Sequence, residues 1–228
     1  MKKCWVILVL LLLTQALPAQ TVPEDTTSRS FDYAVLKYLQ EHRTPVGNKV
    51  WVTVSNSVVL APVPTTGAAV SALCTDNQQT KESRLCDAGE MAFSELLNFG
   101  VTMGAKELVR RPRPWVAYEG DLVCLQPVRS TSFPSGHTSI AFATATSLSL
   151  VYPQWYVAVP AYLWAGAVGY SRMYVGAHYP SDVLVGAVLG TASALVVHYV
   201  RQTIWEREQG APDAIPPSAV VLPVVISF

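Results

Sequence analysis

Residues 133–171 read FPSGHTSIAFATATSLSLVYPQWYVAVPAYLWAGAVGYS, and this stretch contains no Lys, Arg, Asp or Glu. Small residues fill it, and Pro153 divides its apolar part into two segments, 138–152 and 155–170. A third apolar segment, 183–200, is interrupted only by His198. Segments of this length and composition are typical of helices, and short turns between them make neighbouring helices antiparallel.

These segments suit either a membrane or the core of a soluble domain, because each is somewhat shorter than the roughly 20 residues that span a bilayer. Three features favour the membrane: the long charge-free interval, the small residues that allow close helix packing, and the aromatic residues near the segment ends. Those aromatic residues are Tyr152, Trp155, Tyr156, Tyr170, Tyr199 and Trp205. We predict an all-α fold, a bundle of about five to six membrane-embedded helices.

The amino-acid composition of the whole chain is consistent with a membrane-embedded helical protein. It has 228 residues, of which 50% are hydrophobic and only 14% are charged, against roughly a quarter charged in an ordinary soluble domain. Its formal net charge is zero, so no general attraction to nucleic acid is expected. The sequence leaves the oligomeric state open.

The N-terminus, MKKCWVILVLLLLTQALPAQ, has two lysines, a short apolar run and small residues before residue 20. This pattern predicts a secretory signal peptide over residues 1–19, with an uncleaved membrane helix as the alternative. Residues 20–49 form a polar segment and an amphipathic helix that begins at Phe31. We expect the helical core at 50–205, where 74–90 reads as a polar connection, and a tail at 206–228 that has no assigned function.

Chemically useful side chains stand at the predicted helix ends. Lys106 lies near the end of a helix predicted at 91–109 and Arg113 follows that helix. Ser135, Gly136 and His137 open the next helix. Arg172 closes the following helix, and His178 and Asp182 lead into the last one. If the helices alternate in direction, all these groups reach one end of the bundle.

The gathered set suits phosphate chemistry. Lys and Arg bind phosphate oxygens, and a helix N-terminus presents free N–H groups to an anion. Two His with one Asp can supply a nucleophile, an acid and an orienting carboxylate. Carboxylates are scarce there, so a divalent metal has few ligands. We therefore expect phosphoryl transfer with no metal and no cofactor.

Three motifs carry a resemblance: Lys106-x6-Arg113-Pro114, then Pro134-Ser135-Gly136-His137, then Ser171-Arg172-x5-His178-x3-Asp182. In this order they resemble the signature of the type 2 phosphatidic acid phosphatase superfamily, which includes lipid phosphatases, bacterial class A acid phosphatases and vanadium haloperoxidases. Every fixed position matches. The motifs cover residues 106–182, and the helix pattern extends the likeness to about 50–200.

The resemblance implies a role for each matched residue. His178 would be the nucleophile that forms a phosphohistidine, Asp182 would orient it, and His137 would protonate the leaving oxygen. The remaining matched residues would hold the phosphate: Lys106, Arg113, Ser135, Gly136 and Arg172. Asp182 could also serve as an N-cap of the last helix.

Other residues remain open from the sequence alone. Arg110, Arg111 and Arg129 could bind a second anionic group of the substrate or only solvate a loop. Cys74 and Cys86 could form a disulfide in an oxidising compartment, or stay free. His42 and His198 have no partner in the pattern and are interpreted as structural.

With a cleaved signal and alternating helices, the site faces the periplasm from a bacterial inner membrane. The substrate is then a lipid phosphomonoester or pyrophosphate: lipid A, undecaprenyl pyrophosphate or phosphatidylglycerol phosphate, with lipid A first. One alternative is a soluble periplasmic acid phosphatase of broad specificity. Another is a membrane protein that only binds anionic lipid, although binding alone does not need a His nucleophile with an Asp behind it.

Overall fold

The computed structural model describes residues 31–208, with side chains as far as residue 204; the predicted signal peptide and residues 209–228 lie outside this range. Over the described range the chain forms helices and no strand, which confirms the all-α prediction. The helices are α2 (Phe31–Glu41), α3 (Pro45–Asn56), a 3-10 turn η1 (Ser57–Leu60), α4 (Val63–Leu73), α5 (Gln78–Val109), α6 (Pro114–Ala117), α7 (Gly136–Val151), α8 (Trp155–Tyr174) and α9 (Pro180–Glu208).

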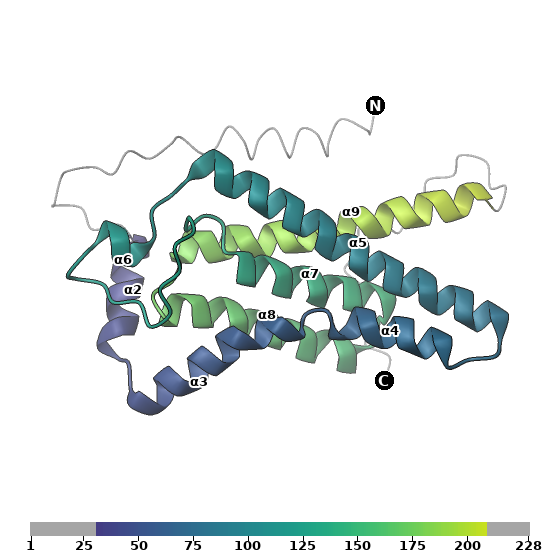
Figure 1. The fold of residues 1–228 in the computed structure, drawn as a ribbon, viewed down its shortest axis with the longest axis horizontal. Coiled ribbons are helices and arrows are strands. Elements are labelled where there is room, and N and C mark those ends of the chain that lie inside the picture. Colours follow the sequence, from purple (N-terminus) through teal and green to yellow (C-terminus); the bar gives the residue numbers. More distant parts are fainter. Residues whose placement is uncertain (1–30, 209–228) are drawn as a thin grey trace.

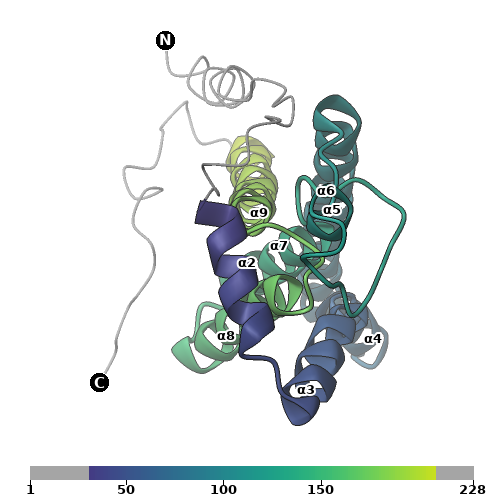
Figure 2. The same cartoon turned by 90° about the vertical axis from the view of Figure 1, so that its left-hand side faces the viewer.

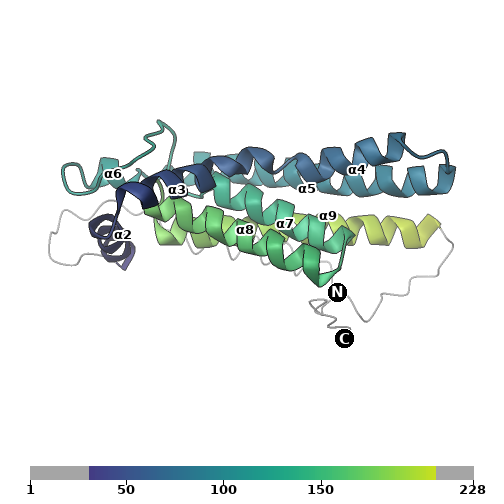
Figure 3. The same cartoon turned by 90° about the horizontal axis from the view of Figure 1, so that it is seen from below.

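The long helices lie side by side and alternate in direction (Figure 1). α3, η1 and α4 together form a broken rod, in which α4 packs against α5 and α3 packs against α8, while α7, α8 and α9 lie side by side (Figure 3). α7 lies in the middle and packs against α5, α8 and α9. The end of α5, the start of α7, the end of α8 and the start of α9 therefore meet at one end of the bundle, as the alternation predicted.

Local sequence signals set the helix ends. The Thr44 side chain accepts a hydrogen bond from Gly47 N–H, and Asn77 does the same for Thr80 N–H, which satisfies donors that a helix start leaves free. Pro62 and Pro64 stand where the first rod breaks, since proline removes a backbone donor. Arg110 ends α5 in a left-handed conformation, with φ of 46°.

Small residues bring α7 and α9 into close contact. Ala141, Ala143, Ala145 and Ala194 are fully buried. A Cβ atom added at Gly190 would lie 2.1 Å from the Ser139 carbonyl oxygen, closer than any real contact. Only glycine fits there, because the two backbones touch.

The predicted polar connection at 74–90 is wrong for most of its length. α5 begins at Gln78, directly after its Asn77 cap, and continues to Val109 as one helix of 32 residues. Residues 78–90, QQTKESRLCDAGE, are mostly good helix formers, and their polarity reflects an exposed helix face. Inside the bundle, buried Glu90 accepts hydrogen bonds from His198 and Arg201 of α9.

Two boundaries differ slightly from those expected. α3 begins at Pro45, before residue 50, and α9 continues through Glu208, past residue 205.

The amphipathic helix predicted at Phe31 is α2. It lies across the end of the bundle where α8 ends and α9 begins (Figure 2), and its Tyr33 and Leu36 pack there with Leu122 and Tyr179.

Candidate active site

The structure brings the sequence-predicted residues together at the end of the bundle that α2 covers. Lys106 comes from the last turn of α5, Arg113 from the loop before α6, and Arg172 from the last turns of α8. His137 stands in the first turn of α7, and His178 in the turn between α8 and α9. The charges of Arg172, Arg113 and Lys106 all act on His137, so four separate segments share one site.

The contact between Arg113 and His178 indicates which tautomer His178 adopts. The Arg113 guanidinium nitrogen Nη1 lies 3.3 Å from His178 Nε2. A guanidinium only donates hydrogen bonds, so the Nε2 lone pair accepts from Arg113 and the proton sits on Nδ1. Nδ1 lies 3.7 Å from the Asp182 carboxylate oxygen Oδ2. His178 therefore presents an unprotonated nitrogen to the site, and its buried Nδ1–H faces the carboxylate at a distance longer than a hydrogen bond.

Asp182 is completely buried and held on both oxygens. Oδ2 accepts hydrogen bonds from the Ser132 hydroxyl and from the Tyr179 N–H, the latter at 3.1 Å. Oδ1 accepts from Arg111 Nη1 at 2.8 Å. Such a carboxylate cannot rotate away from His178 without losing several hydrogen bonds in a buried setting.

The cations that surround His178 are positioned by uncharged oxygen atoms. Arg113 donates to the carbonyl oxygens of Ser130 and Ala177 at 2.7 and 2.8 Å. Lys106 Nζ donates to the Thr131 carbonyl oxygen at 2.9 Å. No carboxylate neutralises either group in these contacts, so both retain positive charge for an anion in the site.

Arg172 is buried and is oriented by Ser55 and Gln126. Its Nη1 donates to the Ser55 hydroxyl and, at 3.2 Å, to Gln126 Oε1. Its Nε is buried and has no hydrogen-bond partner in the described residues. A buried charged donor without a partner is costly, and a phosphate oxygen would satisfy it.

The start of α7 supplies a backbone anion site, with one change from the prediction. Ser135 caps the helix: its hydroxyl accepts from Thr138 N–H and contacts the Thr138 hydroxyl at 2.8 Å. The Ser135 N–H donates to the Asp182 carbonyl oxygen at 3.1 Å, so it is not available to a phosphate. The N–H groups of Gly136 and His137 are the ones that the first turn leaves without an intrahelical acceptor.

Burial and the neighbouring cations lower the pKa of both histidines and favour their neutral forms. Burial is the largest cause that lowers the pKa of His178 to about 4; the Asp182 carboxylate opposes this shift and Arg113 adds to it. Burial also lowers the pKa of His137 to about 3, with further lowering by Arg172, His178, Arg113 and Lys106. Negative charge from a bound phosphate would oppose these cations and raise both pKa values.

Several residues that shape the site carry no sequence motif that we recognised. Ser132 binds Asp182, Ser55 binds Arg172, and Asp32 of α2 binds Arg111. The three consecutive hydroxyl residues Ser130, Thr131 and Ser132, immediately before FPSGH, are a sequence signal that could have indicated this contact. Ser55 and Asp32 lie far away in the sequence and gave no signal.

The structure distinguishes the three arginines whose role the sequence did not decide. Arg110 and Arg129 are exposed, and Arg110 pairs with Glu107. Arg111 is instead tied to Asp182 and Asp32, so it belongs to the support of the carboxylate. Cys74 and Cys86 are exposed and free rather than paired.

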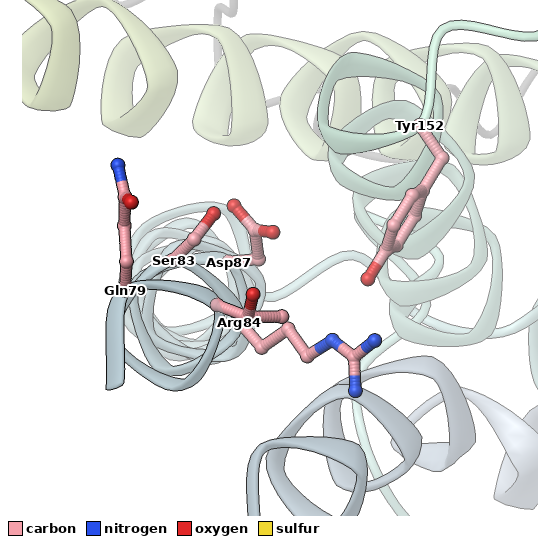
Figure 4. Close-up of a pocket in the computed structure, with 6 residues that line it drawn as sticks. Gln79, Ser83, Arg84, Asp87 and Tyr152 are labelled. Carbon is pink, nitrogen blue, oxygen red and sulfur yellow. The ribbon is translucent and has the colours of Figure 1, made fainter. Parts of the chain in front are cut away.

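Other cavities and clusters lie away from these residues. A polar cavity of about 450 Å³ is lined by α5 residues and Tyr152, with the side chains of Arg84 and Tyr152 extending into the same space (Figure 4). It contains none of the motif residues. Within residues 31–208, no group of three or more His, Cys, Asp or Glu side chains is arranged to hold a metal ion.

The chain is similar in sequence to two lipid A phosphatases. The chain is 27% identical to a lipid A 1-phosphatase of Rhizobium johnstonii over 189 residues, 80% of this chain and 75% of that protein. It is 30% identical to a lipid A 4'-phosphatase of Bacteroides thetaiotaomicron over 77 residues, which are 34% of each chain. The chain thus spans only about a third of the second relative.

Two solved structures share the fold. One is a transmembrane PAP2 type phosphatidylglycerolphosphate phosphatase from Bacillus subtilis, with a TM-score of 0.66, 25% identity, and coverage of 87% of this chain and 94% of that one. The other is Aquifex aeolicus LpxE, with a TM-score of 0.61, 24% identity, and coverage of 75% and 97%. The PAP2 superfamily profile matches residues 87–206, more than half of the chain. The resemblance seen in the motifs is therefore confirmed, and the protein belongs to the PAP2 superfamily.

Proposed function

We propose that the protein is a metal-independent lipid phosphatase that works through a phosphohistidine. One observation carries the proposal: three cations, two neutral histidines and a free helix N-terminus converge where Arg113 contacts the lone pair of His178. The cations and the N–H groups suit a phosphate, and the lone pair suits attack on its phosphorus atom.

In the first step, His178 Nε2 forms a bond to phosphorus while the bond from phosphorus to the lipid oxygen breaks. Asp182 stabilises the positive charge that develops on the imidazole, whose proton on Nδ1 faces the carboxylate. Protonated His137 gives its proton to the leaving oxygen. The negative charge of the bound substrate raises the pKa of His137, so the acid form becomes available when phosphate is present.

In the second step, water attacks the phosphohistidine and His137 removes the proton of that water. The bond between phosphorus and Nε2 breaks, and inorganic phosphate leaves. Lys106, Arg113 and Arg172 stabilise the charge on the equatorial oxygens in both steps. Atoms and protons balance: one water enters, and the dephosphorylated lipid and one phosphate leave.

A lipid substrate is supported by the outer surface of the bundle. Among residues 31–208, one helix, Pro180–Ile204, is long and apolar enough to cross a membrane. Two of its apolar side chains are exposed, Leu184 by 67% and Val188 by 54%. α5 and α8 expose Phe93, Leu96, Phe99 and Leu163. Large apolar patches of this kind suit lipid contact better than water.

In this arrangement the three apolar segments, 138–152, 155–170 and 183–200, lie in the membrane, and the residues at the site end lie at its surface. Lipid A is our first candidate, since a relative that is 27% identical over 80% of this chain is a lipid A 1-phosphatase. Undecaprenyl pyrophosphate and phosphatidylglycerol phosphate are the other candidates. A cleaved signal over residues 1–19 would place the site on the periplasmic side of the inner membrane.

A soluble periplasmic acid phosphatase remains the alternative, because the same site would hydrolyse small phosphate esters. Two measurements separate the proposals. A lipid phosphatase should stay in the membrane pellet after an alkaline carbonate wash, whereas a soluble enzyme should be released. Protein purified in detergent is then assayed on lipid A, undecaprenyl pyrophosphate, phosphatidylglycerol phosphate and p-nitrophenyl phosphate.

The test of the mechanism is phosphate release in EDTA by the wild type and by His178→Ala. We expect full wild-type activity in EDTA and none in the variant, and ³²P from a labelled substrate should remain on wild-type protein after alkaline quenching, since phosphohistidine survives alkali. Full activity in His178→Ala would refute the site. Binding of anionic lipid with no turnover by the wild type would favour a non-catalytic lipid-binding protein.

A further inference from the structure

The N-terminal helix α2 is joined to the carboxylate behind the nucleophile by a continuous chain of charged contacts. Asp32, in the first turn of α2, accepts from Arg111 Nη2 at 2.9 Å. The same guanidinium donates through Nη1 to Asp182 Oδ1 at 2.8 Å. Asp182 Oδ2 in turn faces His178 Nδ1. One planar guanidinium therefore bridges two carboxylates that are 150 positions apart in the sequence.

Asp32 also holds the helix that carries Asp182. Its Oδ1 accepts from the Ser181 N–H at 3.1 Å, and its Oδ2 accepts from the Ser181 hydroxyl. Ser181 lies in the first turn of α9, next to Asp182. A side chain from another helix thus satisfies one of the free donors at the α9 N-terminus, where negative charge is stabilising.

The connecting arginine has little freedom. Its charged carbon lies 3.7 Å from the centre of the Tyr179 ring, a stacking contact that suits a guanidinium. Ser181 accepts a third hydrogen bond from it at 2.8 Å. Arg111 is consequently fixed against the first turn of α9. The carboxylate of Asp32, whose side chain is only 14% exposed, pairs with the side of the guanidinium that faces away from Asp182.

We propose that Asp32 is a positioning residue for the phosphatase reaction: through Arg111 and Ser181 it fixes the Asp182 carboxylate against His178. This inference rests on the proposed function, because it assumes that His178 is the nucleophile. α2 is then part of the active site's support, although it lies outside the residues that match the PAP2 profile.

The test compares Asp32→Asn with Asp121→Asn in the full-length protein in detergent. Asp121 also binds α2, through the Lys37 ammonium at 2.5 Å and the Tyr33 hydroxyl. Both variants weaken the docking of α2, and only the first removes the charge that holds Arg111. His178→Ala is measured in parallel.

We expect Asp32→Asn to lower kcat about tenfold, since misplacing a catalytic group by a fraction of an ångström costs on this scale. KM should stay within about twofold, because the phosphate ligands are untouched. Asp121→Asn should keep the wild-type kcat. In a double-mutant cycle, Asp32→Asn should cost less in an Arg111→Met background than in the wild type, because the contact between Asp32 and Arg111 is already lost there and only the contacts with Ser181 remain.

Each result bears on one proposal. Wild-type kcat in Asp32→Asn, an equal loss in Asp121→Asn, or additive losses with Arg111→Met would overturn the positioning role while leaving the nucleophile in place. Retained activity in His178→Ala would instead overturn the proposed function. If Asp32→Asn does not yield folded protein, Asp32→Ser tests the same contact, because the shorter, uncharged serine cannot form the ion pair with Arg111.

Discussion

The contact between α7 and α9 makes Gly190→Ala the sharpest test of how the fold positions the site. The new methyl carbon would lie 2.1 Å from the Ser139 carbonyl oxygen and 2.9 Å from the Ala143 nitrogen. Both are backbone atoms of α7, so no side chain can rotate away. A carbon and a carbonyl oxygen rest at about 3.3 Å or more, so α9 must move outward by about 1 Å.

That movement changes the distance between catalytic groups carried by the two helices. α7 carries His137 in its first turn, and α9 carries Asp182 in its first turn. A displacement of about 1 Å at a catalytic group costs up to roughly 100-fold in rate. Overpacking of this kind also destabilises by about 1–3 kcal/mol, which corresponds to a Tm about 2–12 °C lower in a chain of this size.

The assay measures phosphate release and Tm on detergent-purified protein. Gly166→Ala is the matched control, because nothing lies within 4 Å of a Cβ atom there; this variant should keep its activity and gain helix stability of about 0.5–1 kcal/mol. Wild-type kcat and Tm in Gly190→Ala would refute the argument that the glycine is required by backbone contact.

Two further predictions concern pH and the opposite part of the bundle. With a folded pKa of about 4 against about 6.5 unfolded, His178 takes up its proton first in the unfolded chain, so it lowers stability as pH falls from about 6.5 to 4, by up to about 3 kcal/mol. The Tm of His178→Gln should therefore fall less than that of the wild type between pH 7 and 4.5; equal falls would contradict this. Glu90→Gln should lower stability by about 1–2 kcal/mol, because His198 and Arg201 lose a buried carboxylate acceptor while Arg201 keeps Asp87. Its kcat should be unchanged, since Glu90 lies about 24 Å along α5 from Lys106, and a loss of kcat without a loss of Tm would show that this prediction is wrong.

The helical core was predictable because its signals are local. The charge-free segments, the proline at 153 and the glycine and alanine content indicated packed antiparallel helices, and they were found there. The exception is residues 78–90, where a solvated helix face looked like a loop. Polarity reports exposure to water, and it does not distinguish an exposed helix from an exposed connection.

The motif residues were also predictable, because phosphate chemistry needs particular side chains and antiparallel helices bring their ends together. The sequence could not show which of these groups already form hydrogen bonds inside the protein. Ser135 N–H is bound to the Asp182 carbonyl oxygen, and Arg111 is bound to two carboxylates. Both looked available for substrate when only their residue types were known.

The sequence by itself determined the all-α class, the order of the helices and the set of residues at one end of the bundle. Only the tertiary structure decided how that set is supported: α2 over the site, Ser55 on Arg172, and Asp32 on Arg111. The physical reason is that helix formation depends on neighbours within a few residues, whereas these hydrogen bonds join residues more than 75 positions apart. Such contacts exist only after the whole chain has packed.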